Sequence, residues 1–106
     1  MIITPAAEIA GYKVVKTLGL VRGNTIRARN VARDILAILK NLVGGEIEEY
    51  TKMMAEARDQ AIDRMLAEAQ GLGANAITDV RFATSYMMGA ASEILAFGNA
   101  VVVEPE

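Results

Sequence analysis

The spacing of apolar residues changes twice along this chain, and these changes constrain the fold more than any other feature of the sequence. Between about Thr25 and Gly71 the apolar residues recur every three or four positions, as in amphipathic helices. The segments on either side, Tyr12–Val21 and Asn75–Val103, are rich in β-branched and aromatic residues, as strands are. We therefore expect an α+β domain in which a strand, two helices and two further strands follow one another.

Two helices are expected within the central segment, and a glycine pair separates them. The first begins near Thr25, and its apolar stripe contains Val31, Ile35, Ile38 and Leu42. Gly44-Gly45 ends it, because glycine accepts the left-handed conformation that satisfies the last carbonyl groups of a helix. The second helix follows at once and runs to about Gly71. Its apolar stripe consists of Tyr50, Met54, Ala57, Ala61, Met65, Ala69 and Leu72.

The predicted strands lie toward both ends of the chain. Gly11 and Gly23 bound the first one, Tyr12–Val21, and a shorter strand is expected at Ile2–Thr4. Asn75–Tyr86 alternates between apolar and polar residues, as a half-buried strand does. We therefore expect an antiparallel or mixed sheet with two helices packed on one face.

The last predicted strand, Glu93–Val103, is apolar on both of its faces. It follows a glycine-containing connection at Met87–Ser92, which is short enough for a hairpin. A strand of this kind needs cover on both sides. Because the helices cover only one side, we expect a neighbouring subunit to cover the other, with Phe97, Val101 and Val103 at the interface.

The composition agrees with a single domain that associates with copies of itself. The 106 residues are enough for one domain with one modest core, and no linker divides residues 1–106. Apolar residues make up 53% of the chain, which is high for a small soluble protein. Some of this apolar surface is therefore expected to face another subunit.

Charge and cysteine content argue against several classes of partner and location. The net charge of -2 provides no general field for attracting nucleic acid or an anionic membrane. Without cysteine there is no disulfide framework, so a cytoplasmic location is expected. The segment Met1–Val15 lacks the features of a signal peptide, and the apolar run Ile94–Val103 is too short to span a bilayer.

Several short motifs occur in succession along the chain. They are Val43-Gly44-Gly45, Ala57-Arg58, Leu72-Gly73-Ala74-Asn75-Ala76-Ile77 and Gly98-Asn99-Ala100-Val101-Val102-Val103. Together they resemble the YbjQ-like family of small bacterial and archaeal proteins, over nearly the whole chain. The resemblance implies a ring-shaped homopentamer, and the family is often labelled a putative heavy-metal-binding domain. The chain departs from the family at Glu46 and Ile47, where a basic and a small hydroxyl residue are common, and at Asn99, where threonine is common.

A heavy-metal site would need thiolate or imidazole ligands, and the chain contains neither cysteine nor histidine. The best hard-oxygen candidates are Glu56, Asp59 and Asp63, although a solvated acidic helix face explains them better. Thioethers could bind copper(I) only if three of them converged, and core or interface packing explains the methionines better. The methionines in question are Met53, Met54, Met65, Met87 and Met88. The sequence identifies no cofactor.

Arginines gather where the first strand is expected to enter the first helix. The cluster consists of Arg22, Arg27, Arg29 and Arg33. Arg27 and Arg29 are the candidates for binding a phosphate or carboxylate group, because a helix N-terminus also attracts anions. Pairing with the acidic group Glu46, Glu48 and Glu49, within the chain or across a subunit interface, is the preferred alternative.

No catalytic constellation is recognisable, because the chain has no histidine for a triad and no cysteine for a thiolate nucleophile. A serine such as Ser85 or Ser92 would need a nearby lysine as its base, and the sequence does not show which lysine lies near either serine. The leading interpretation is a non-enzymatic, homo-oligomeric module, pentameric by the family resemblance. The alternative is a protein that binds a metal ion or a small anion at a subunit interface.

Overall fold

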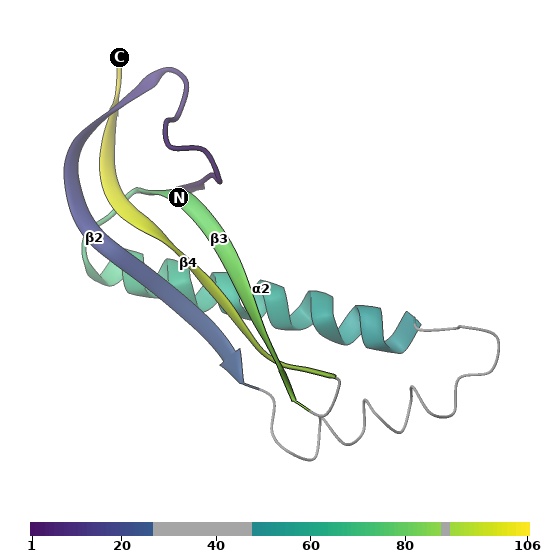
Figure 1. Cartoon of the computed structure of the whole chain (residues 1–106). Helices are drawn as coiled ribbons and strands as arrows, with labels where there is room; N and C mark the ends of the chain where they lie inside the picture. The colour runs from purple at the N-terminus through teal and green to yellow at the C-terminus, as the bar shows by residue number, and fades with distance from the viewer. Residues whose placement is uncertain (27–47, 88–89) are drawn as a thin grey trace.

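A computed structural model of the protein describes residues 1–26, 48–87 and 90–106, with the side chains of residues 1–25, 52–85 and 93–106. Within these residues a four-stranded sheet, in the order β1-β3-β4-β2, lies against one helix (Figure 1). The elements are β1 (Ile2–Ile3), β2 (Tyr12–Ile26), α2 (Glu48–Gly71), β3 (Ala76–Met87) and β4 (Ala90–Pro105). The α+β class is confirmed, whereas the first predicted helix falls almost entirely on residues 27–47, outside the described ranges.

The strands combine both kinds of pairing. β1 pairs with β3 in parallel, while β2 and β3 both run antiparallel to β4. The mixed sheet and the pairing of the last two strands therefore confirm the prediction. β4 lies between β2 and β3.

β2 is longer than its sequence pattern indicated. It continues through Gly23 to Ile26, whereas the prediction ended the strand before Gly23 and began a helix near Thr25. Gly23 is buried, and a side chain there would overlap the backbone of α2 around Ala61. The Thr25 hydroxyl also donates a hydrogen bond of 3.0 Å to the carbonyl oxygen of Ala57. Gly23 therefore permits close approach of the helix and does not end the strand.

The predicted apolar stripe of α2 forms the centre of the core. Ala57, Ala61, Met65 and Ala69 are between 0% and 3% exposed, and they pack against the sheet. Three of these four residues are alanines, which let the helix lie close to the strands. The prediction was wrong for Leu72, which is 49% exposed because α2 ends one residue earlier.

The helix ends in a turn that depends on glycine. Gly73 has a φ of 88°, a conformation that side chains disfavour. Its N–H donates to the carbonyl oxygen of Gln70 at 3.0 Å, and the Ala74 N–H donates to that of Ala69 at 3.0 Å. This pair of hydrogen bonds is the Schellman arrangement, which satisfies carbonyl groups at the end of a helix.

Asn75 connects this turn to the sheet. Its Nδ2 donates to the Val103 carbonyl oxygen at 2.9 Å, and its Oδ1 accepts from the Val103 N–H at 2.8 Å. The side-chain amide thus imitates a strand backbone and extends the pairing of β3 with β4. The run from Leu72 to Ile77 therefore has a structural role.

This chain itself supplies part of the cover that was predicted to come from another subunit. Val101 and Val103 are 3% and 6% exposed, and they pack against Ile2 and Ile9 of the N-terminal segment. The pairing of β1 with β3 holds that segment against the sheet. Of the three predicted interface residues, only Phe97 keeps a partly exposed side chain.

Candidate functional site

α2 covers one face of the sheet, and no described segment covers much of the other. Alternation along β2 places Val21 and Gly23 against α2, so Leu20 and Arg22 point to the opposite side. In Figure 1, α2 passes behind the strands, with no described segment in front of them where it crosses. Leu20 is 63% exposed, which is unusual for a large apolar side chain in a sheet. We call this surface the open face; its residues are Leu20, Arg22, Arg81, Leu95, Phe97 and Asn99.

Arg22, Phe97 and Arg81 form one row across three adjacent strands of the open face. Phe97 is the register partner of Arg22 in β2 and of Arg81 in β3. Directly opposed residues have Cβ atoms about 5 Å apart, so both arginine side chains begin next to the aromatic ring. The row combines aromatic surface with two positive charges, and this combination suits a partner that presents carboxylates or another anionic group.

A bulge in β3 adjoins this row. The register of β3 against β4 shifts between Thr78 and Arg81, and Asp79, within the bulge, has a φ of 56°. Its Oδ2 accepts hydrogen bonds from Asn99 Nδ2 at 3.1 Å and from Thr78 Oγ1 at 3.3 Å. Aspartate tolerates the left-handed conformation better than most residues, because its short polar side chain can bond locally. The bulge determines which side chain of β3 stands opposite Phe97.

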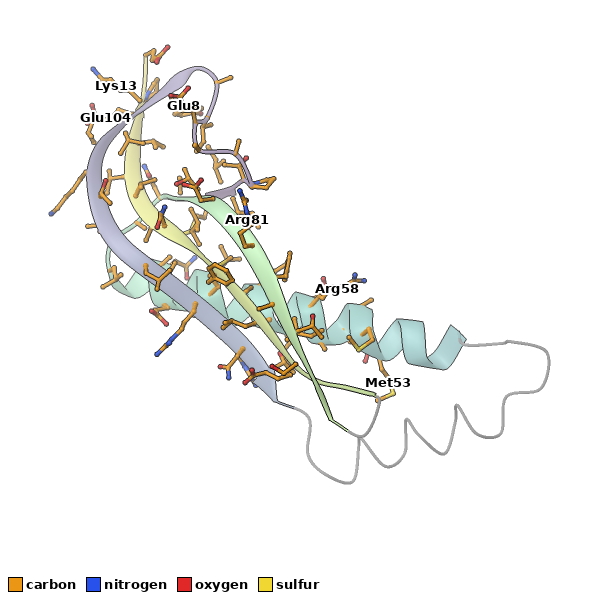
Figure 2. The ribbon with its side chains drawn as sticks, in the orientation of Figure 1. Glu8, Lys13, Met53, Arg58, Arg81 and Glu104 are labelled. Carbon is orange, nitrogen blue, oxygen red and sulfur yellow. The ribbon has the colours of Figure 1, made fainter. Side chains whose placement is uncertain are left out.

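The N-terminal segment holds Arg81 in place. Arg81 Nη1 donates to the carbonyl oxygens of Pro5 at 2.7 Å and Val80 at 2.9 Å. Figure 2 shows Arg81 beside the N-terminal segment. The Asp79 N–H donates to the carbonyl oxygen of Ala6 at 3.0 Å. The guanidinium is therefore positioned by backbone contacts on one side, which lowers the entropy cost of using its other donors for a partner.

Asp79→Val is expected to lower the free energy of unfolding by about 2 kcal/mol. A β-branched side chain is strained at positive φ, and the two hydrogen bonds to the carboxylate are lost. Asp79→Asn keeps an acceptor oxygen and tolerates the same backbone, so its stability should stay within about 0.5 kcal/mol of the wild type. Urea unfolding measures both variants. Equal stability of the two variants would show that neither the backbone strain nor the hydrogen bonds at the bulge matter.

The candidate metal ligands from the sequence all lie on α2. Glu56, Asp59 and Asp63 are exposed, on the side of the helix away from the core. Within the described ranges, no group of three or more acidic side chains is arranged to hold a metal ion. Their role as metal ligands stays a prediction. The anion-site candidates, Arg27 and Arg29, fall outside the described residues.

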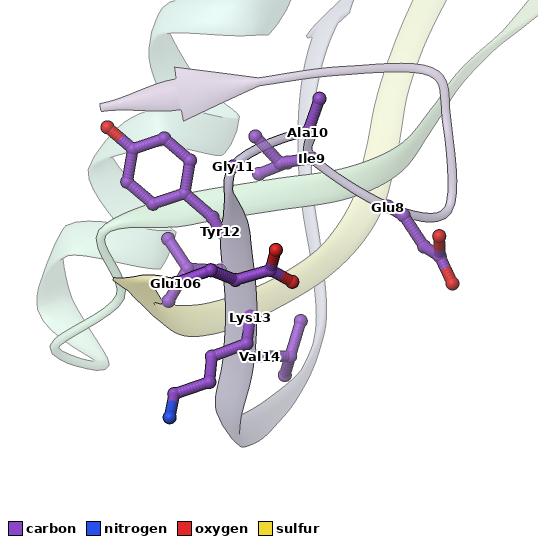
Figure 3. A pocket seen from close by; sticks show the side chains of 9 residues that line it. Glu8, Ile9, Ala10, Gly11, Tyr12, Lys13, Val14 and Glu106 are labelled. Carbon is purple, nitrogen blue, oxygen red and sulfur yellow. The ribbon is translucent and has the colours of Figure 1, made fainter.

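A pocket of about 670 Å³ lies at the other end of the sheet, between the N-terminal segment and the start of β2. Its charged side chains are Glu8, Lys13 and Glu106. In Figure 3 the ends of these three side chains point in different directions. They do not converge on a common point, so the pocket offers no defined arrangement of charges for a ligand.

Comparison with known proteins identifies the family. Residues 1–104 match the model of the YbjQ family, whose description reads "Putative heavy-metal-binding". The chain belongs to the YbjQ family. The resemblance noted in the sequence is therefore confirmed over nearly the whole chain.

Relatives of this YbjQ chain occur in bacteria and archaea. It is 60% identical to a UPF0145 protein of Dehalococcoides mccartyi over 104 residues, covering 98% of this chain and 100% of the relative. It is 55% identical to a UPF0145 protein of Pyrococcus horikoshii, covering 98% of this chain and 89% of the relative. A crystal structure of a DUF74-family protein of unknown function from Pediococcus pentosaceus is similar, with a TM-score of 0.51 and 17% identity. That match covers 100% of this chain and 98% of the other, and it supports the fold alone.

The heavy-metal description of the family does not fit the donor atoms of this member. Soft metals select thiolate and imidazole, and the whole chain contains no cysteine and no histidine. Met65 is fully buried in the core, where its sulfur serves packing. Met54 is packed against the same core. The side chains of Met87 and Met88 lie outside the described part.

The residues of the open face were mostly missed by sequence reasoning. Phe97 was predicted as an interface residue, and Arg22 was noted only as part of the arginine cluster. Arg81 and Asn99 join the site only through the register of three strands. A signal for the bulge existed in Asp79, because aspartate is uncommon within strands. No described helix is long and apolar enough to cross a membrane.

Proposed function

We propose that this protein is a non-enzymatic cytoplasmic module that works as an assembly of identical subunits, with a pentameric ring as the form that its family resemblance implies. The open face carries this proposal. Leu20 is 63% exposed there and lies diagonally across from the partly exposed Phe97, and the partly exposed Leu95 is next to Phe97 on the same face of β4. Contiguous apolar surface of this kind marks interaction sites, whereas isolated exposed apolar residues are ordinary.

The edge of the sheet supports the same proposal. Within the described residues β2 pairs only with β4, so its other edge has unpaired backbone groups along much of its length. Val14 and Val15 near its start are 48% and 46% exposed. An exposed, apolar edge strand favours pairing or packing with another chain, and assembly into a closed ring removes that surface from water.

The proposal also holds that the protein does not catalyse a reaction. The chain has no histidine or cysteine, which removes the commonest general base and the thiolate nucleophile. The charged side chains of the pocket beside the start of β2 do not converge on a common point (Figure 3). A binding or scaffolding role therefore accounts for the exposed aromatic ring and arginines of the open face better than a reaction does.

A second candidate is the binding of a small anion at the subunit interface, because Arg22 and Arg81 both flank Phe97. Phosphate or a carboxylate ligand that binds only the assembled, folded protein would raise its melting temperature. A phosphate-dependent rise that Arg22→Gln abolishes would favour this candidate. If phosphate leaves the melting temperature unchanged, the second candidate is excluded at the concentrations used.

Native mass spectrometry of the untagged protein, with and without a chelator, tests the main proposal. We expect a mass that is a whole multiple of the chain and no chelator-sensitive increment, because the donor set does not suit heavy metals. A single-chain mass at all concentrations would refute self-assembly. An increment that a chelator removes would show that this chain binds metal despite its lack of soft ligands.

A further inference from the structure

The exposed side of α2 carries acidic residues, whereas the open face carries arginines. Glu56, Asp59 and Asp63 are exposed and lie opposite the buried stripe of the helix. Lys52 also lies on this side, so the four residues together carry a net charge of about -2 at neutral pH. We call this surface the outer face, and its residues are Lys52, Glu56, Asp59, Asp63 and Ala67.

The acidic residues of the outer face repel one another when no partner neutralises them. Asp59 and Asp63 are four residues apart, so their carboxylates are neighbours and repel each other slightly. A guanidinium brought between them by another molecule would replace this repulsion with two attractions. Ala67, one turn after Asp63, is small and exposed, which leaves room for a bulky apolar side chain of a partner.

The spacing of the acidic residues on the outer face matches the spacing of the arginines on the open face. Along the helix, Glu56 and Asp63 are separated by seven residues, a rise of about 10.5 Å. Across the open face, Arg22 and Arg81 are separated by two strand spacings, about 9.6 Å. In the interface inferred below, a helix lying across the strands brings Asp63 to Arg22 and Glu56 to Arg81. Phe97 would then lie beneath the helix, between the two charge pairs.

We propose that the open face of one copy packs on the outer face of α2 in the next copy. The inference rests on the proposed self-assembly and names the two surfaces that carry it. Both are present on every chain and they differ from one another, so each copy offers one of each. Such head-to-tail contacts close into a ring when the rotation between copies permits, and otherwise extend as a filament.

Charge reversal on each surface, singly and together, tests this interface. Arg22→Glu and Asp63→Arg each place like charges opposite one another, so each should raise the apparent dissociation constant at least about tenfold. In the double variant the contact between positions 22 and 63 is again complementary, because each copy carries both changes. We expect the double variant to recover most of the lost affinity. Sedimentation velocity over a range of concentrations measures the apparent dissociation constants of the wild type, the single variants and the double variant.

Folding of the variants can be checked separately. Arg22 is exposed, and Asp63→Arg removes the repulsion from Asp59, so both single variants should keep the circular dichroism spectrum of the folded wild type. Glu8→Lys is the matched control, since it reverses an exposed charge in the N-terminal segment, outside the open face, the outer face and the β2 edge. Its assembly should match that of the wild type.

The possible results distinguish the proposed interface from self-assembly in general. Recovery in the double variant supports the interface. An oligomeric wild type that neither single variant weakens overturns this interface and leaves self-assembly standing. A double variant weaker than both single variants also overturns it, because the two residues then do not face one another. A monomeric wild type overturns both this interface and the proposed self-assembly.

Discussion

Gly23→Val is expected to lower the free energy of unfolding by at least about 3 kcal/mol, which is a large part of the stability of a small domain. Valine has a higher strand propensity than glycine, but that preference amounts to about 1 kcal/mol at most. The added side chain would overlap the helix backbone around Ala61 and Met65, and backbone cannot rotate away as a side chain can. The helix must therefore move off the sheet and expose the core.

Thermal unfolding followed by circular dichroism measures this effect, and we expect the melting temperature to fall by at least about 12 °C. Gly71→Val is the matched control, because nothing lies within 4 Å of a side chain at that position. Its stability should change by about 0.5 kcal/mol or less. A Gly23→Val protein as stable as the control would show that α2 does not approach β2 as closely as described.

Val101→Asp is expected to lose its fold, whereas Phe97→Asp is expected to fold but to lose its assembly. Val101 is 3% exposed within the chain, so a carboxylate there would be buried without a partner, at a cost of several kcal/mol. That variant should be unfolded at any concentration. Phe97 is partly exposed between Arg22 and Arg81, so an aspartate there gains two cationic neighbours and the chain should still fold.

The assembly of Phe97→Asp should nevertheless be lost. The substitution removes the aromatic surface of the open face, and its single negative charge halves the net positive charge of Arg22 and Arg81, which would otherwise attract an acidic partner. Phe97→Leu is the control, since it keeps an apolar side chain of similar reach and should retain the assembly. Circular dichroism distinguishes an unfolded variant from a folded, dissociated one. Loss of folding in Phe97→Asp would indicate that Phe97 belongs to the core and not to an interface.

The helix was predictable because its pattern depends on local spacing alone. Ala57, Ala61, Met65 and Ala69 recur at four-residue intervals, and the same residues form the buried stripe. The end of the helix was predicted near Gly71, and α2 does end there, before the turn at Gly73. Neither inference needed to know what the helix packs against.

The end of β2 was not predictable from the same kind of signal. Gly23 has the same identity as the glycines that end elements, yet it lies inside a strand because α2, far along the chain, approaches it there. The residues that cover Val101 and Val103 could not be predicted for the same reason, because they are also distant in the chain. The pattern of β4 correctly indicated that both faces need cover, but it could not show that Ile2 and Ile9 supply part of it.

The open face depends on register, which sequence spacing does not reveal. Arg22 and Arg81 are distant in the chain, and they flank Phe97 only because β2 and β3 pair with β4 in one particular alignment. The bulge at Asp79 shifts that alignment by one residue. A shift of one residue would move every following side chain of β3 to the opposite face.

Sedimentation velocity of the wild type beside folded Phe97→Asp most directly tests the claim that this chain assembles through its open face. We expect the wild type to sediment as a whole multiple of the 11.3 kDa chain and Phe97→Asp to sediment as a single chain at the same concentrations. A wild type that sediments as a single chain, or a folded Phe97→Asp that keeps the wild-type mass, would contradict it.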